Sequence, residues 1–247
     1  MTALLELADV SKRYGGVIAN SHVNLMVPEG AIIGLIGPNG SGKTTLFNSI
    51  AGTHAIDGGS VRFAGQEISK LRVPQIARLG LLRTYQQTRV FRQMSCITNL
   101  LVSERADEHL SGMIARPSAA QMARAAELLE FVGLSSKRDL LAGSLSFGQQ
   151  KLLEFAMALM GNPRLLLLDE PTAGINPTLI NGLVDRLRRA REALGITLLV
   201  IEHNMRVMMN LAEHIYCMAR GEILAEGKPE EIKNDPRVIA AYLGQSE

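Results

Sequence analysis

The alternation of apolar and polar residues divides the chain into short strands and longer helices. Near the N-terminus, residues 4–10 and 21–27 alternate with a period of two, which predicts two antiparallel strands. Three later segments are almost wholly apolar, which is typical of strands buried on both faces of a parallel sheet. These segments cover residues 31–36, 165–168 and 196–201. The chain therefore predicts an α/β core with an antiparallel N-terminal part.

Helical spacing of apolar residues predicts several helices, two of which begin at a capping box. Ser118 and Gln121 have capping-box spacing before a helix that Gly133 can stop, and Ser146 and Gln149 repeat that spacing before a helix that runs to Met160. From about residue 87 to 145 the chain is predominantly helical, so we expect a helical lobe inserted into the core. Further helices are expected over 45–51, 73–78 and 177–194 and after Pro229 and Pro236, and further strand pairs at 58–64 with 68–70 and at 215–219 with 222–226.

Composition bounds the class of protein. With 247 residues, 47% hydrophobic and 20% charged, the chain is long and apolar enough to bury a core. A net charge of +2 does not favour a nucleic-acid partner, because proteins that bind phosphate backbones usually carry a basic stripe. Cys96 and Cys217 lie too far apart for a zinc or redox motif, which fits a reducing compartment. The N-terminus lacks the features of a signal peptide, and no apolar segment approaches the ~18 residues that a membrane-spanning helix needs.

A glycine-rich loop follows the first buried strand and precedes a predicted helix. It fits the phosphate-binding pattern G-x-x-x-x-G-K-[ST], and its residues are Gly37, Pro38, Asn39, Gly40, Ser41, Gly42, Lys43 and Thr44. Glycine lets backbone N–H groups approach a phosphate, Lys43 adds a charge for the β- and γ-phosphates, and the Thr44 hydroxyl can bind Mg²⁺. The alternative is an ordinary glycine loop, but the strand before it and the helix after it favour nucleotide binding.

Polar residues follow the other two buried strands. Asp169 and Glu170 end the run of four leucines, and His203 comes after the next strand. In parallel sheets, ligands bind outside the carboxyl ends of the strands, so these acids are expected to serve a cation or a reaction. A strand-end polar pair and a structural histidine are the alternatives. Taken alone, Ser146 is the cap of an ordinary helix and Tyr14 a strand-edge aromatic.

The order of these motifs resembles the ATP-binding subunit of ABC transporters over essentially the whole chain. The P-loop is followed by Gln86 after a strand, by the segment Leu145-Ser146-Phe147-Gly148-Gln149, by the four leucines with Asp169-Glu170, and by His203. The resemblance implies a P-loop NTPase core with a mixed, mainly parallel sheet, an N-terminal antiparallel β subdomain and an inserted helical subdomain. It also implies a single ATP-binding domain over residues 1–247, with the helical subdomain at about 87–145.

The resemblance implies a role for each matching residue. Tyr14 is expected to stack on adenine, residues Gly37 to Thr45 to hold the phosphates of ATP, and Thr44 and Gln86 to bind Mg²⁺ with support from Asp169. Glu170 is expected to be the catalytic base that orients water, and His203 to contact the γ-phosphate. Ser146, Gly148 and Gln149 resemble the signature that closes over ATP bound to an opposite subunit.

Four residues depart from the usual family pattern. They are Phe147 in the signature, Met157 in the helix after it, Asn176 in the loop after Asp169-Glu170, and Asn204 beside His203. Because Ser146 and Gly148 are intact, we expect activity to survive.

Several segments, among them Gln149-Gln150, residues 173–177, residues 201–205 and the C-terminal run 238–244, resemble the larger ATPase subunit of branched-chain amino-acid importers. Importers of urea and short amides share them. Implied partners are transmembrane permease subunits, a second ATP-binding subunit (a sister cassette or a second copy), and a periplasmic substrate-binding protein. We expect a cytoplasmic protein, peripheral on the inner face of the membrane. The alternatives are an exporter cassette and an ABC-type ATPase without a membrane partner that acts in DNA repair or translation.

Overall fold

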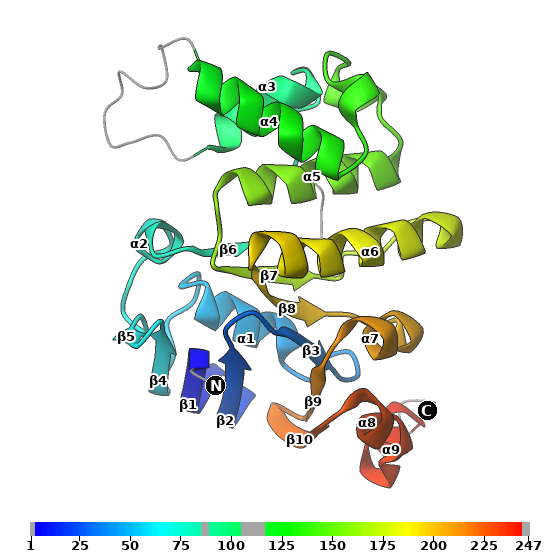
Figure 1. Cartoon of the computed structure of the whole chain (residues 1–247). Helices are drawn as coiled ribbons and strands as arrows, with labels where there is room; N and C mark the ends of the chain where they lie inside the picture. The colour runs from blue at the N-terminus through cyan, green and yellow to red at the C-terminus, as the bar shows by residue number, and fades with distance from the viewer. Residues whose placement is uncertain (1–2, 85–88, 105–116, 244–247) are drawn as a thin grey trace. The chain divides into compact units, whose positions relative to one another are not determined.

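The computed structural model describes residues 3–84, 89–104 and 117–243 and divides into two compact units (Figure 1). Unit 1 comprises Met1–Arg83, Arg164–Thr172 and Leu187–Glu247. Unit 2 comprises Thr84–Pro163 and Ala173–Arg186.

The main sheet of unit 1 has six strands in the order β10-β9-β3-β8-β7-β6. Its strands are β3 (Ile32–Ile36), β6 (Leu81–Arg83), β7 (Leu165–Asp169), β8 (Thr197–Ile201), β9 (His214–Ala219) and β10 (Glu222–Gly227). All neighbours pair in parallel except β9 and β10, which form an antiparallel hairpin at one edge. The buried strands expected from the apolar segments are confirmed: every residue of β3, β7 and β8 is buried.

A second, antiparallel sheet has the order β2-β1-β4-β5. Its long strands β1 (Ala3–Tyr14) and β2 (Val17–Pro28) confirm the alternation in the sequence. The prediction of a strand at 68–70 was wrong, because β4 (Gly58–Phe63) pairs instead with β5 (Gln66–Glu67). Ala64 and Gly65 both adopt positive φ and reverse the chain within two residues, so the partner strand already begins at Gln66. Ile68, which was predicted to lie in that strand, is instead buried in the core.

Helix α1 (Lys43–Ile50) packs in one hydrophobic core with both sheets. Its Leu46, Phe47 and Ile50 are fully buried among side chains of β1, β4, β3 and β7, such as Leu5 and Leu35. Burying a side chain of this size contributes roughly 1.5–3 kcal/mol relative to its exposed state. The start of α1, and with it the glycine-rich loop, is therefore anchored to the sheet.

The other helices of unit 1 are α2 (Val73–Arg78), α7 (Met205–Leu211), α8 (Pro229–Asn234) and α9 (Pro236–Leu243). Helices α8 and α9 pack on each other and on β10 at the C-terminal end of the chain (Figure 1). Unit 2 contains α3 (Cys96–Ser103), α4 (Ala119–Phe131) and α5 (Phe147–Met160), which contact one another. Helix α6 (Pro177–Leu194) contributes residues to both units.

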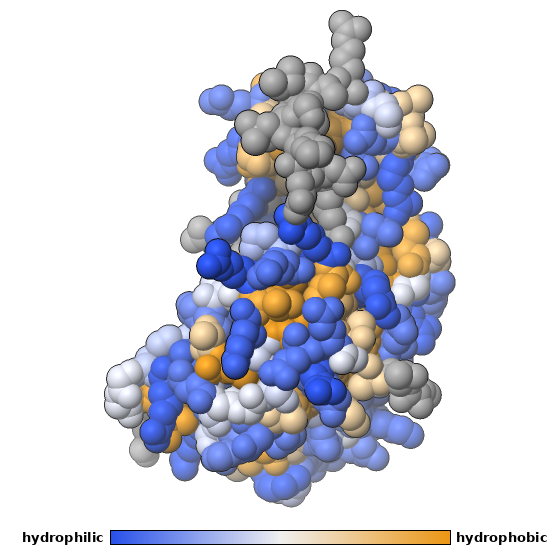
Figure 2. Space-filling model, turned by 90° about the vertical axis from the view of Figure 1, so that its left-hand side faces the viewer, coloured by the Kyte–Doolittle hydropathy of each residue, from blue (hydrophilic) through white to orange (hydrophobic). Residues whose placement is uncertain are grey.

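Among the described residues, no helix is long and apolar enough to span a bilayer. The face of the molecule that carries α2 and β5 is mostly hydrophilic, with hydrophobic residues grouped among the polar ones (Figure 2). Val73, at the start of α2, is one of the large hydrophobic residues that remain exposed in unit 1.

Candidate functional site

The glycine-rich loop joins the carboxyl end of β3 to the start of α1, as the pattern predicts. Gly37 and Gly42 have φ of 144° and 102°, and a Cβ atom at either would lie 2.2–2.3 Å from a backbone oxygen. Gly40, with φ of 77°, has open space around it. Glycine is therefore required at the first two positions by close packing and at Gly40 by conformation alone. Helix α1 begins at Lys43, and Thr44 and Thr45 are its next two residues. The free N–H groups and the partial positive charge of the helix N-terminus therefore lie at the loop that is expected to hold phosphates.

The Lys43 side chain is folded back onto its own loop. Its Nζ donates to the carbonyl oxygens of Gly37 at 2.7 Å and Pro38 at 2.9 Å, and lies 3.4 Å from Ser41 Oγ. Lys43 is 5% exposed, and burial lowers the pKa of its ammonium group while the negative charge of Glu170 opposes that shift. The loop thus concentrates one buried cation and several N–H donors, which suits a polyphosphate.

Asp169 ends β7 and is held by a buried ion pair. Arg83, at the end of the neighbouring strand β6, donates from Nη2 to Asp169 Oδ2 at 2.8 Å, and both side chains are 6% exposed. The other arm of Arg83 donates to Asn48 Oδ1 on α1 at 2.5 Å. An exposed hydroxyl on Thr44 and a carboxylate on Asp169 are oxygen donors of the kind that Mg²⁺ prefers, so the residues present fit that ion.

Glu170 directly follows Asp169 and faces His203. Its backbone has φ of 50°, unusual for a residue other than glycine, and its N–H donates to the carbonyl of Ile201 at 2.9 Å. The Glu170 Oε1 lies 2.7 Å from His203 Nε2. Both side chains retain access to solvent, with 18% of Glu170 and 39% of His203 exposed. The pair therefore presents a solvent-accessible carboxylate, held by His203, at the carboxyl ends of β7 and β8.

A buried carboxylate joins the two loops that carry this pair. Glu202 is 2% exposed and accepts from both the N–H and the hydroxyl of Thr172, at 2.8 and 2.6 Å. Its other oxygen accepts from the Asn204 N–H at 3.5 Å. The sequence places Glu202 with His203 at the carboxyl end of a buried strand, but no role for Glu202 was predicted from it.

Tyr14 lies at the end of β1, half exposed, with a defined partner. Its phenol oxygen is 2.6 Å from His54 Nδ1, and the two rings meet edge to face. The Lys12 ammonium lies 5.3 Å from the ring centroid and pairs with Asp57 at 3.1 Å. The backbone N–H of Arg13 is the main cause that lowers the pKa of Asp57. Tyr14 is thus oriented by neighbours, among which the sequence analysis had missed His54.

Ser146, Gly148 and Gln149 stand together at the start of α5 in unit 2. Ser146 and Gln149 form the predicted capping box, in which the Ser146 N–H donates to Gln149 Oε1 at 3.1 Å and the Gln149 N–H to Ser146 Oγ at 3.4 Å. The unusual Phe147 is half exposed, and a Cβ at Gly174 would lie 2.9 Å from its ring. Gly174, with φ of 72°, therefore makes room for Phe147.

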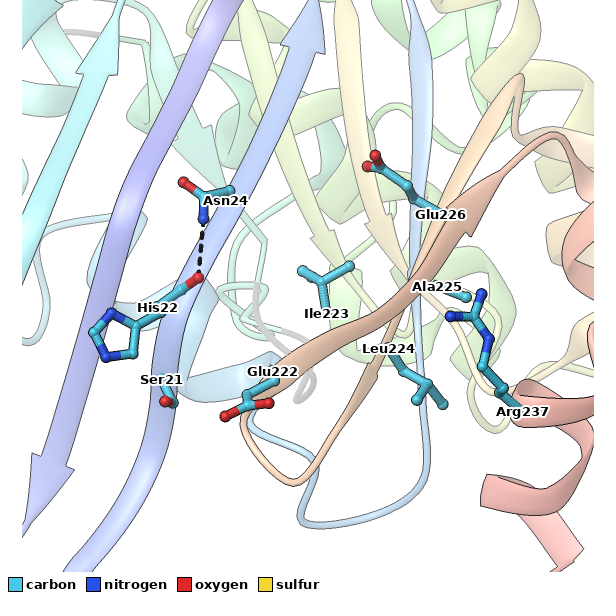
Figure 3. A pocket seen from close by; sticks show the side chains of 9 residues that line it. All are labelled: Ser21, His22, Asn24, Glu222, Ile223, Leu224, Ala225, Glu226 and Arg237. Carbon is cyan, nitrogen blue, oxygen red and sulfur yellow. Dashed lines mark hydrogen bonds between the residues drawn. The ribbon is translucent and has the colours of Figure 1, made fainter.

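The structure places the predicted residues of unit 1 other than Tyr14 at the carboxyl ends of strands of the main sheet, whereas Tyr14 ends β1 of the antiparallel sheet. The loop of Lys43 follows β3, Asp169 and Glu170 end β7, and His203 follows β8, and these three strands are parallel neighbours. Gln86 lies outside the described residues. A pocket of about 560 Å³, lined by residues of β2 and β10 together with Arg237 of α9, contains none of the predicted residues (Figure 3).

Comparisons with known proteins agree with this geometry. A family model described as "ABC transporter" matches residues 20–173, and one described as "Branched-chain amino acid ATP-binding cassette transporter" matches residues 222–247. The chain is 40% identical to the high-affinity branched-chain amino acid transport ATP-binding protein BraF of Pseudomonas aeruginosa and 39% identical to LivG of Escherichia coli, over 98% of each chain. It also resembles a crystal structure of the ADP conformation of an ATP-binding cassette, with a TM-score of 0.90, 33% identity, and coverage of 99% of this chain and 100% of that one.

Proposed function

Because the chain belongs to the ABC transporter family and is an ATPase of that family, we propose that it energises import of branched-chain or related amino acids. The observation that carries the proposal is the arrangement in unit 1 of the Lys43 loop, Asp169 and the Glu170–His203 pair at the ends of adjacent parallel strands. Phosphoryl transfer needs positioned charges more than covalent chemistry, and this edge supplies them. The likeness to BraF and LivG supports the class of substrate.

In the proposed mechanism, Lys43 exchanges its bonds to the Gly37 and Pro38 carbonyls for the β- and γ-phosphates of ATP. Backbone N–H groups of Asn39 to Thr45 hold the phosphates, and Tyr14 stacks on the adenine. Thr44, Gln86 and Asp169 would hold Mg²⁺, which neutralises phosphate charge when bound. Arg83 keeps the Asp169 carboxylate aimed at this site.

Glu170 accepts a hydrogen bond from the attacking water and orients it toward the γ-phosphate. His203 holds Glu170 and contacts the γ-phosphate itself. We propose that Ser146, Gly148 and Gln149 act on ATP bound to a second ATP-binding subunit, so that ATP joins two subunits and hydrolysis releases them. The second subunit is a sister cassette or another copy of this chain.

The proposed partners are supported by the likeness to transport ATP-binding proteins. The chain would work as one ATP-binding domain with its helical subdomain at about 87–145, on the inner face of the membrane. There it would bind transmembrane permease subunits supplied by a periplasmic substrate-binding protein. Hydrolysis would thus drive a conformational change in proteins that this chain contacts.

The substitution Glu170→Gln tests the proposed base. The amide keeps the size of the side chain but cannot accept a proton, so ATP hydrolysis should fall at least about a hundredfold. ATP affinity should remain, and an ATP-bound dimer should accumulate, detected by size-exclusion chromatography of the chain with its sister cassette or alone.

Lys43→Ala is the control for nucleotide binding, because it should abolish both ATP affinity and the dimer. Normal turnover by Glu170→Gln would refute the role of Glu170. If the unmodified protein neither bound nor hydrolysed ATP in the presence of magnesium, the whole proposal would fail.

A further inference from the structure

The C-terminal helix α9 reaches the first glycine of the phosphate-binding loop. The phenol oxygen of Tyr242 accepts a hydrogen bond from the Gly37 N–H at 2.8 Å, across 205 positions of sequence. Both residues belong to unit 1. The mechanism described above makes no use of this contact.

The backbone at Gly37 is closely surrounded by other atoms. Its φ of 144° is open to glycine, and a Cβ there would lie 2.2 Å from the Met218 carbonyl oxygen and 2.8 Å from Ser41 Oγ. The peptide before Gly37 is held by Tyr242 through the N–H, and the peptide after it by Lys43 through the carbonyl. The entry to the loop is thus fixed from both sides.

Helix α9 flanks the loop over more than one contact. A pocket of about 210 Å³ is lined on one side by loop residues 38–41 and on another by Ala240 and Ala241 of α9, with Ala219 and Arg220 completing the wall. Burial raises the pKa of Tyr242 to about 12, so its phenol is neutral and intact at physiological pH.

We propose that Tyr242 is a positioning residue of the nucleotide site, acting through Gly37, and that α9 is a structural support of the phosphate-binding loop. The inference rests on the proposed function. When Lys43 turns to the phosphates, the Gly37 carbonyl gives up its bond to the ammonium group. The Tyr242 bond then continues to hold Gly37 while the loop carries the ligand.

The chain offers a matched pair of tyrosines for the test. The phenol of Tyr216, on β9, also bonds to backbone groups: it accepts from the Met26 N–H at 3.2 Å and donates to the Met26 carbonyl oxygen at 3.3 Å. Tyr216 is likewise buried enough that its pKa is raised. Tyr242→Phe therefore removes one phenol–backbone hydrogen bond at the loop, and Tyr216→Phe removes two at β2, which makes Tyr216→Phe a stringent control.

ATP affinity, KM and kcat are measured for both variants, together with hydrogen exchange of a peptide that contains Gly37. Loss of one neutral hydrogen bond corresponds to about a fivefold effect on an equilibrium. We expect Tyr242→Phe to weaken ATP binding and raise KM about fivefold with kcat nearly unchanged, and to speed exchange around Gly37. Tyr216→Phe should leave all of these at the values of the unmodified protein.

Equal ATP affinity in the two variants, with Lys43→Ala still defective, would overturn the role of Tyr242 and leave the proposed function intact. Failure of Tyr242→Phe to fold would assign Tyr242 a purely structural role and would also overturn the proposal. If the unmodified protein binds no ATP, it is the proposed function that fails.

Discussion

At the scale of single residues, the Asp169 carboxylate serves two partners. It is proposed to support Mg²⁺, and it already accepts a hydrogen bond from Arg83 in a setting where both side chains are almost fully buried. Removing two charges from water is costly and is offset only when they pair well. Arg83 also reaches Asn48 on α1, so a single guanidinium ties the acid to the helix that follows the phosphate-binding loop.

Replacing Arg83 with Met should therefore expose the cost of an unpaired buried carboxylate. We expect the free energy of unfolding of the ligand-free protein to fall by about 3–5 kcal/mol, measured by urea denaturation. The double variant Arg83→Met with Asp169→Asn should recover a large part of this loss, because no charge is then left unpaired. Strictly additive losses in the double variant would show that the two residues do not interact as the structure indicates.

The sequence could not reveal such partners. Arg83, His54 and Tyr242 each act on a residue between 40 and 205 positions away, and nothing in their neighbouring sequence indicates it. The residues of local motifs were predictable, because the conformation of a loop such as 37–44 is determined largely by residues within the loop itself.

At the scale of elements, two helices of unit 2 begin with the same kind of capping box but are proposed to have different functions. Ser118 and Gln121 cap α4, and Ser146 and Gln149 cap α5, each pair with reciprocal hydrogen bonds. A capping serine contributes about 1 kcal/mol to a helix. Helix capping is common to both serines, but only the start of α5 is also proposed to contact the nucleotide.

Ser146→Ala and Ser118→Ala form a matched comparison. Each should lower stability by about 1 kcal/mol in chemical denaturation. Only Ser146→Ala should also impair formation of the ATP-bound dimer, assayed in the Glu170→Gln background. A Ser118→Ala protein with the same dimer defect would trace the effect to helix stability and remove the signature role of Ser146.

Most elements were predictable because apolar periodicity and end signals agree within them. The capping boxes of α4 and α5 and the all-apolar strands β3, β7 and β8 are found where the sequence indicates. The strand after Gly65 was misplaced because its two residues, Gln66 and Glu67, are both exposed and carry no apolar signal. Its position depends on the turn conformation at Ala64, which composition does not encode.

At the scale of the whole molecule, the proposed functions are divided between the two units. Unit 1 holds the Lys43 loop, Asp169, Glu170 and His203, whereas unit 2 holds Ser146 and its neighbours. Fold class was predictable at this scale from the order of motifs. Which residues associate into each compact unit was not, since unit 2 includes 173–186, a segment that follows Asp169 and Glu170 in the sequence.

Hydrogen exchange can test this division. In the Glu170→Gln protein, MgATP at a hundred times its Kd should stabilise the binding-competent state by about 2.7 kcal/mol and protect the peptide around Lys43. Protection should extend to the start of α5 only where the dimer forms, and should be lost there in Glu170→Gln with Ser146→Ala. Protection of α5 in a verified monomer would contradict the assignment of Ser146 to an opposite subunit.

The buried carboxylate of Glu202 has a consequence for how this protein can change over generations. Because one side chain bonds both Thr172 and Asn204, the loops that carry Glu170 and His203 share a single support. Replacing Glu202 would remove an acceptor from both loops at once, whereas the contact at Asn204 is made by the backbone N–H and does not depend on the side chain at 204. Exchange of Glu202 for a residue without an acceptor would leave the Thr172 hydroxyl and two backbone N–H groups without this partner, so we expect change at position 202 to be disfavoured.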